Sequence, residues 1–171
     1  MSIIKSFSLI LFSLTFCCCQ SIKTKNKPFA VAKEGSVVIN IDTTAYKKFL
    51  EDNLFADRKV VLNTIQIKEQ KTLSSGETFY YVYLATKDKK IKVARWLNKK
   101  GDNFYVNDEI EEGPLFEQSY LICEGGGDCG PEVYIDKENR LWGCSKIIAC
   151  YVEGVKMECS SAKTYIEPYE E

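Results

Sequence analysis

The sequence contains no histidine. This absence removes the Ser-His-Asp and Cys-His catalytic arrangements, because both use an imidazole as the general base. It also removes the side chain with which proteins most often bind transition metals. Carboxylates, lysines and hydroxyls are the groups that remain for any chemistry.

The chain also lacks an apolar run long enough to form a membrane-spanning helix near its N-terminus. The apolar run at residues 7–16 follows Lys5 and precedes three consecutive cysteines. About 10 to 13 apolar residues fall short of the roughly 20 that a helix needs to cross a bilayer. A basic residue, an apolar stretch and small residues in this order predict a secretory signal peptide over residues 1–18.

The cysteines that end this segment resemble the lipobox of bacterial lipoproteins, in which a thiol just after the cleavage site carries a diacylglycerol. Leu14 lies three residues before Cys17, as in that family, but the bulky Phe16 directly precedes Cys17. Cys18 and Cys19 each follow a small residue but have no leucine three positions earlier. The resemblance implies a lipid anchor at one of these three cysteines on a bacterial membrane. The alternative is a plain secretory signal that is cut nearby.

Charge of neither sign is in excess. The chain has 23 basic and 24 acidic residues and a formal net charge of −1. Such a balance gives no field that would attract nucleic acid, so we expect no nucleic-acid partner. An apolar content of 45% and an aromatic content of 12% are typical of a folded domain. The length allows one domain with a modest core.

Five further cysteines lie in the last third of the chain: Cys123, Cys129, Cys144, Cys150 and Cys159. In an exported protein, closely spaced cysteines predict disulfides. The two Cys-x5-Cys spacings favour local pairs among the first four, although four cysteines allow three connectivities. Cys159 is then the odd thiol. A structural zinc site is the alternative, but its cysteines are usually two to four residues apart.

The remaining sequence divides into a tether and one domain. Residues 19–35 are polar, contain several lysines and are interrupted by Pro28, which is typical of a flexible linker. Residues 36–171 form the predicted domain, with a cysteine-rich segment at 120–160.

Periodicity within this domain predicts an α+β fold. Asp42 can cap a helix whose apolar positions Tyr46, Phe49, Leu50 and Leu54 recur every three or four residues. The later segments alternate as strands do and are separated by turn-forming residues. These strands are predicted at residues 60–67, 78–86, 91–97 and 104–106. The expected architecture is one helix packed on an antiparallel β-meander, with a disulfide-rich C-terminal β extension.

The clearest candidate site is a set of aromatic residues on the central strands. Tyr81 and Tyr83 would share one face of a strand, and Tyr80 would lie on the other. One face should pack on the helix. If the other is exposed, then Tyr80, Tyr81, Tyr83 and Trp96 form a possible binding surface. The alternative is a sheet whose two faces are covered by the helix and the cysteine-rich tail.

Two further segments invite a functional interpretation. The acidic run at residues 108–113 offers oxygen ligands to calcium, but it lacks the spacing of an EF-hand loop, which favours a solvated loop. The Gly-rich residues 124–128 are not followed by the Gly-Lys-Ser/Thr of a phosphate-binding loop, which favours a turn. We therefore expect no metal and no cofactor.

These observations predict a membrane-anchored lipoprotein of the bacterial cell envelope without enzymatic activity, which binds an envelope protein or a surface ligand. An inhibitor or immunity-type protein that blocks an enzyme with a loop at residues 125–130 is the first alternative. A small hydrolase that uses carboxylates is the second, and it would require a deep pocket lined by two or more acids.

Overall fold

The computed structural model describes residues 27–73, 75–107, 115–126, 129–136, 139–144, 151–152, 155–156 and 159–170. The predicted signal peptide and the three candidate lipidation cysteines lie outside these residues. Within them, no helix is long and apolar enough to cross a bilayer.

The described elements are two helices and twelve strands. They are β1 (Ala30–Lys33), β2 (Ser36–Ile39), α1 (Thr43–Leu54), β3 (Thr64–Lys71), β4 (Thr78–Ala85), β5 (Ile91–Lys100), β6 (Asn103–Tyr105), α2 (Leu115–Gln118), β7 (Tyr120–Glu124), β8 (Pro131–Asp136), β9 (Asn139–Cys144), β10 (Tyr151–Val152), β11 (Val155–Lys156) and β12 (Ser160–Thr164). Every strand pairing among them is antiparallel.

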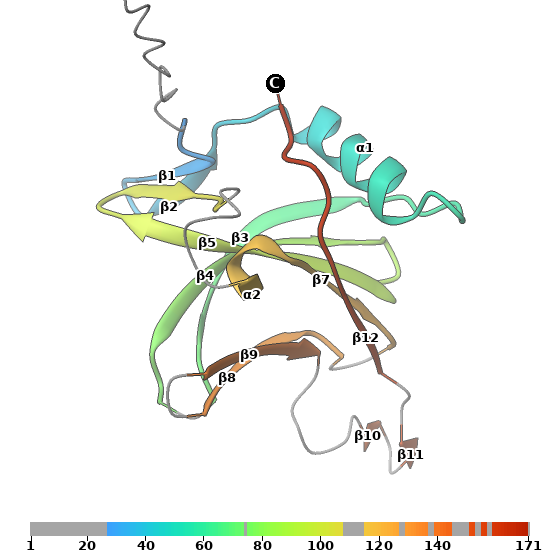
Figure 1. Cartoon of the computed structure of the whole chain (residues 1–171). Coiled ribbons are helices and arrows are strands. Elements are labelled where there is room, and N and C mark those ends of the chain that lie inside the picture. Colours follow the sequence, from blue (N-terminus) through green and yellow to red (C-terminus); the bar gives the residue numbers. More distant parts are fainter. Residues whose placement is uncertain are drawn as a thin grey trace, which may run out of the picture.

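The predicted helix is confirmed as α1. Asp42 is its N-cap and accepts hydrogen bonds from the backbone N–H groups of Thr44 and Ala45 at 2.9 and 3.0 Å. Such a side chain supplies partners for N–H groups that the first turn leaves unpaired. Tyr46 and Leu50, one turn apart, are buried against the sheet. α1 therefore lies across one face of the large sheet (Figure 1).

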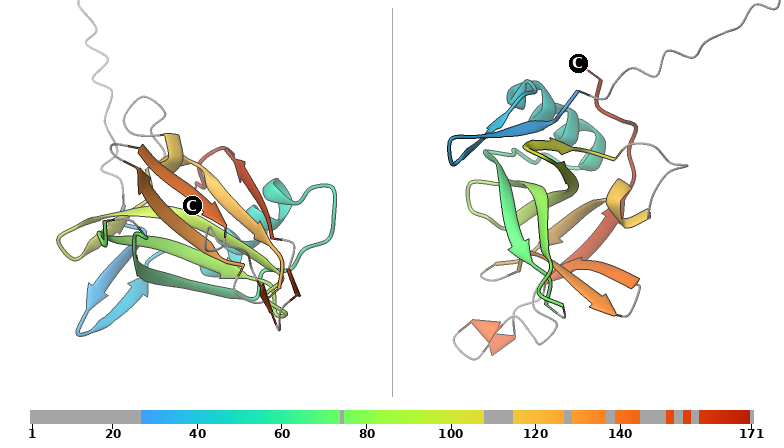
Figure 2. Two further views of the ribbon diagram at one scale, coloured as in Figure 1. Left: turned by 90° about the horizontal axis from the view of Figure 1, so that it is seen from below. Right: turned by 90° about the vertical axis from the view of Figure 1, so that its left-hand side faces the viewer.

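The large sheet is organised around β5. Strands β3 to β6 follow one another as hairpins, as the predicted meander requires, but β7 also pairs with β5 and β1 pairs with β6. The first half of β5 is thus flanked by β4 and β7, and its end pairs with β6. The strands curve around the core below α1 rather than lying in one plane (Figure 2). The sheet is barrel-like and richer in β structure than a single meander on a helix.

The molecule has three layers. α1 covers one face of the sheet and the β8–β9 hairpin covers the other (Figure 1). Side chains alternate along the strands, so each face has its own core. On β4, Val82 and Leu84 pack toward α1, whereas Phe79, Tyr81 and Tyr83 pack toward the hairpin.

The predicted boundary between tether and domain is wrong. β1 begins at Ala30, and the preceding Phe29 is buried, so the domain starts inside the segment that was predicted to be flexible. β1 and β2 form a hairpin whose turn residues Glu34 and Gly35 both have positive φ, 46° and 80°. That turn requires the left-handed region, which glycine adopts without steric cost. Residues 19–26 lie outside the described residues.

The C-terminal region is not a separate extension. β7 pairs with β5, and β12 pairs with β7, so the last strand belongs to the large sheet. Among the described strands, only the hairpins β8–β9 and β10–β11 form sheets of their own. The chain after β12 returns to α1, where Tyr169 packs against Tyr46 and Phe49 with ring centroids 5.2 and 5.4 Å apart.

Candidate functional site

The predicted aromatic binding surface is buried. Tyr81, Tyr83 and Trp96 are only 3%, 7% and 6% exposed. They lie beneath the β8–β9 hairpin, whose Trp142 meets the ring of Trp96 at 5.5 Å. Tyr80 lies on the opposite face, half-buried against Phe104 at 5.2 Å. These residues belong to the core and form no exposed binding surface. The alternative, a sheet whose two faces are covered by the helix and the cysteine-rich tail, is the arrangement that the structure shows.

The environment of the two buried tyrosines agrees with a structural role. Burial raises the pKa of Tyr81 and Tyr83 above the ordinary value, because the phenolate would be poorly solvated. The Tyr81 hydroxyl donates a hydrogen bond to the Gln70 side chain at 3.0 Å. Both hydroxyls therefore stay protonated at neutral pH and contribute packing rather than acid–base chemistry.

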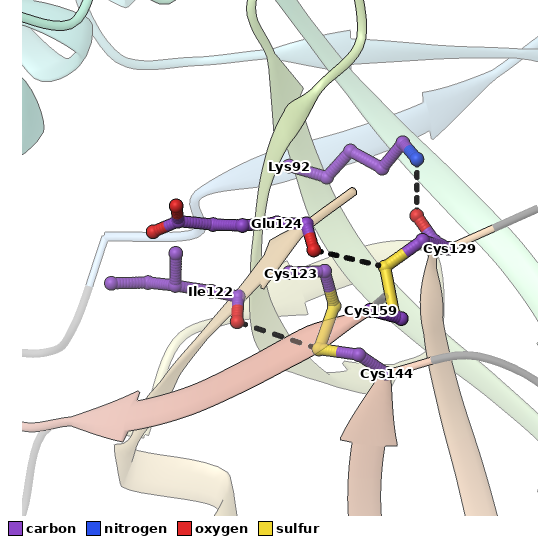
Figure 3. The surroundings of a disulfide bond; sticks show 7 residues. All are labelled: Lys92, Ile122, Cys123, Glu124, Cys129, Cys144 and Cys159. Atoms are coloured by element: carbon purple, nitrogen blue, oxygen red, sulfur yellow. Dashed lines mark hydrogen bonds between the residues drawn. A yellow bond between two sulfur atoms is a disulfide. The ribbon is translucent and has the colours of Figure 1, made fainter. Parts of the chain in front are cut away.

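Two disulfides join the layers on this side of the sheet. One links Cys123 on β7 to Cys144 at the end of β9, and the other links Cys129 to Cys159 just before β12 (Figure 3). Their Cα–Cα separations of 5.5 and 5.7 Å are ordinary for disulfides. Disulfides were predicted for Cys123, Cys129 and Cys144, and all three form them.

The predicted local pairing is wrong, and so is the assignment of Cys159 as the odd thiol. The partners are set by stacking rather than by closeness in sequence, because β9 lies over β7 and Cys159 stands beside Cys129. Cys150, the fourth predicted partner, lies outside the described residues.

Polar contacts hold the surroundings of these disulfides in place. The ammonium group of Lys92 is buried and donates a hydrogen bond to the backbone carbonyl of Cys129 (Figure 3). The N–H of Gly125 donates to the carbonyl of Lys90 at 2.9 Å. Both described flanks of the Gly-rich loop, on either side of residues 127–128, are therefore attached to β5 or to the turn that precedes it.

Other predicted sites stay largely outside the described residues. The acidic run at 108–113 is among them. Within the described ranges, no group of three or more Cys, Asp or Glu side chains is arranged to hold a metal ion.

An open hollow lies at the end of the sheet where β4 turns into β5. Its apolar lining residues, which we call its floor, are Val60, Val61 and Ile91, and Thr86 lines it as well. Val61 is 51% exposed, although it is a large aliphatic residue. The hollow thus combines an accessible apolar surface with a position at the rim of the domain.

The other lining residues of the hollow, which we call its rim, are charged. Lys59, Lys87 and Lys90 line the hollow together with a single acid, Asp88. Asp88 accepts hydrogen bonds from the Thr86 hydroxyl at 2.6 Å and from the Lys90 backbone N–H at 3.1 Å. These two bonds hold the pKa of the Asp88 carboxyl below its ordinary value. The rim is therefore mainly cationic, and its one carboxylate is engaged within the turn.

Sequence reasoning missed this site because Lys59 is far from Lys87 and Lys90 in the chain. Lys87 and Lys90 lie in the turn predicted between the strands at 78–86 and 91–97, and Lys59 lies in the segment between α1 and β3. The hydrogen bond from the Asn63 N–H to the Ala85 carbonyl at 2.9 Å brings the two segments side by side. Of the signals in the sequence, only the three lysines within residues 87–90 pointed to a cationic rim.

Comparison with known proteins assigns no relative to the chain. No family model, no curated protein and no solved structure matches it. The geometry of the described residues therefore carries the functional argument.

Proposed function

We propose that this chain is an exported lipoprotein, anchored to a bacterial envelope membrane through Cys17, Cys18 or Cys19, which binds a partner without catalysing a reaction. The N-terminal sequence supports the export and the anchor. The single observation that carries the proposal is the pair of disulfides in the folded domain.

Disulfides persist in oxidising compartments and are rare in the reducing cytosol. Cys123 and Cys129 are fully buried, so their thiols would be poor targets for redox chemistry. The bonds instead attach the β8–β9 hairpin and β12 to β7 and its following loop. This bracing suits a small domain that must stay folded outside the cell.

Binding fits the described surface better than catalysis does. The basic hollow is open and contains one acid, Asp88, whereas a carboxylate-based hydrolase requires two acids across an enclosed cleft. The interior below α1 and below the hairpin is filled by packed side chains. We therefore place the binding region at the rim of the sheet rather than on its face.

The inhibitor hypothesis requires a protruding loop at residues 125–130. Gly125 donates its N–H to Lys90, and Cys129 is buried and bonded to Cys159. These flanks are fixed to the body of the domain, so the described residues give this second function no specific support.

The test is the intact mass of the membrane-extracted protein, alkylated with and without prior reduction. We expect a cleaved, acylated chain in which four of the five distal cysteines resist alkylation until they are reduced. Single Ser substitutions of Cys17, Cys18 and Cys19 locate the acceptor, because only one of them should abolish the lipid mass. A chain without lipid, with all five distal thiols free, would contradict both the compartment and the anchor.

A further inference from the structure

We propose that the basic hollow binds an extended acidic segment of a partner protein, in which carboxylates flank an apolar side chain. This inference rests on the proposed binding function and names the chemistry of its partner. It is carried by the charge, rigidity and apolar floor of the hollow, and by the place of the hollow in the domain.

Positive charges outnumber negative ones at the hollow, where Asp88 is the one acid beside Lys59, Lys87 and Lys90. Lys59, Lys87, Lys89 and Lys90 are exposed, and none of them forms an ion pair with another residue in the described part of the chain. Lys68 adds a further charge: burial and the nearby Lys89 ammonium lower its pKa. Like charges gathered this way repel one another, and an incoming anionic group would relieve that repulsion.

Hydrogen bonds hold the backbone of the turn that carries these lysines in a fixed conformation. The Lys89 N–H donates to the Thr86 carbonyl and the Thr86 N–H donates to the Ile91 carbonyl, both at 3.0 Å. Lys89 has a φ of 56°, a left-handed conformation that costs energy for a residue with a side chain. A rigid turn that carries lysine where glycine would be less strained presents its charges with little loss of backbone entropy on binding.

The apolar floor selects among anionic partners. Inorganic phosphate has no apolar part, so it would leave the exposed side chain of Val61 in contact with water. A segment with an aliphatic residue between acids covers Val61 and Ile91 and at the same time brings carboxylates to the lysines. Protein interfaces commonly combine such an apolar centre with a charged rim.

The location favours a protein over the anchoring membrane. β1, the first described strand, pairs with β6 beside Lys99 and Lys100 at the far end of β5. The hollow adjoins Ile91 at the near end, and a ten-residue strand is about 30 Å long. The turn between β4 and β5 thus lies at the other end of the sheet from β1 (Figure 1). A tether that enters at β1 would leave the hollow beside this turn accessible to another protein.

The test measures binding of the full, lipidated protein in detergent micelles to a fluorescent peptide of six glutamates around a central leucine. We expect binding that weakens strongly as salt is raised, because the contacts are between exposed charges. Exposed ion pairs each change affinity by about 1.5- to 5-fold, so replacing Lys59, Lys87 and Lys90 together with Gln should weaken binding by about 3- to 125-fold. Val61→Ser should weaken it by about 2- to 5-fold.

A charge-matched control replaces three other exposed lysines, Lys33, Lys71 and Lys163, with Gln. We expect this control to bind the peptide within about twofold of the wild type at physiological salt, where the Debye length is about 8 Å. Equal losses in both triple variants would overturn the proposal, since they would reflect net charge alone. Absence of measurable peptide binding by the wild type would overturn it as well.

Anionic lipid is tested with vesicles containing phosphatidylglycerol, using the protein with Cys17, Cys18 and Cys19 replaced by Ser so that no anchor contributes. The proposed partner would be a membrane rather than a protein under two conditions. Vesicle binding would have to depend on Lys59, Lys87 and Lys90, and the two triple variants would have to bind the peptide equally. None of these results depends on the lipid mass, so failure of this inference is distinct from failure of the proposed function.

Discussion

Replacing Trp142 with alanine should strongly destabilise the domain by weakening the cover over one face of the sheet. Trp142 is 2% exposed, and its ring meets those of Trp96, Tyr81 and Phe79 at centroid distances of 5.5, 5.7 and 6.0 Å. Truncating a buried Trp or Phe to Ala typically costs about 3–5 kcal/mol, which combines lost transfer energy with a cavity. We expect a loss of about 4 kcal/mol, a large part of the 5–15 kcal/mol that is typical of a folded domain.

The assay is equilibrium unfolding in urea, followed by far-UV circular dichroism with the disulfides intact. With a urea slope of about 2 kcal/mol per M, the midpoint should fall by about 2 M. Trp142→Phe is the matched control, because it keeps a ring and removes an indole N–H that has no hydrogen-bond partner among the described residues. We expect it to cost about 1–2 kcal/mol. A midpoint shift below about 0.5 M for Trp142→Ala would refute the packing that we describe.

Two further predictions concern cross-links in the same region. Replacing Cys129 and Cys159 together with Ala should lower the unfolding free energy by about 3–4 kcal/mol, because the disulfide closes a loop with a separation of 30 residues and so reduces the entropy of the unfolded chain. Adding reductant to the wild type and to the double variant should remove this difference between them. Hydrogen bonds from Arg58 lower the pKa of Glu124 below the ordinary 4.5. The pair therefore stabilises the fold above pH 4.5, and this stabilisation is lost as the pH falls through the lower pKa of the folded state. Glu124→Gln should lower the unfolding free energy by less than about 1 kcal/mol at pH 7, because the side chains of Arg58 and Glu124 are both partly exposed, and it should have no effect in strong acid. A difference from the wild type that does not change with pH in urea titrations would contradict this assignment.

Local signals in the sequence were sufficient for several elements. The side chain of Asp42 and the spacing of Tyr46 and Leu50 predicted α1, and both features depend only on residues within one or two turns. β4 and β5 were likewise predicted from β-branched and aromatic residues between turn formers. By contrast, the short strand β1 follows Pro28 and a run of lysines, and this polar composition concealed it.

The burial of the aromatic residues could not be predicted from local sequence patterns. Alternation shows which side chains share a face of a strand but not what covers that face. A signal was nevertheless present in β4, because the stretch from Phe79 to Ala85 has no clearly polar position and thus no face suited to water. The hollow beside Lys59 and the partners of the cysteines depend on contacts between distant segments, which periodicity cannot supply.

The interleaving of the two disulfides has a topological consequence. The loop closed by Cys123–Cys144 contains Cys129, and the loop closed by Cys129–Cys159 contains Cys144. Any single proteolytic cut of the backbone between Cys123 and Cys159 therefore leaves the two fragments covalently joined, whereas local pairs would allow a cut between Cys129 and Cys144 to separate them. After such a nick, the last described strand, β12, would stay covalently attached to the rest of the domain.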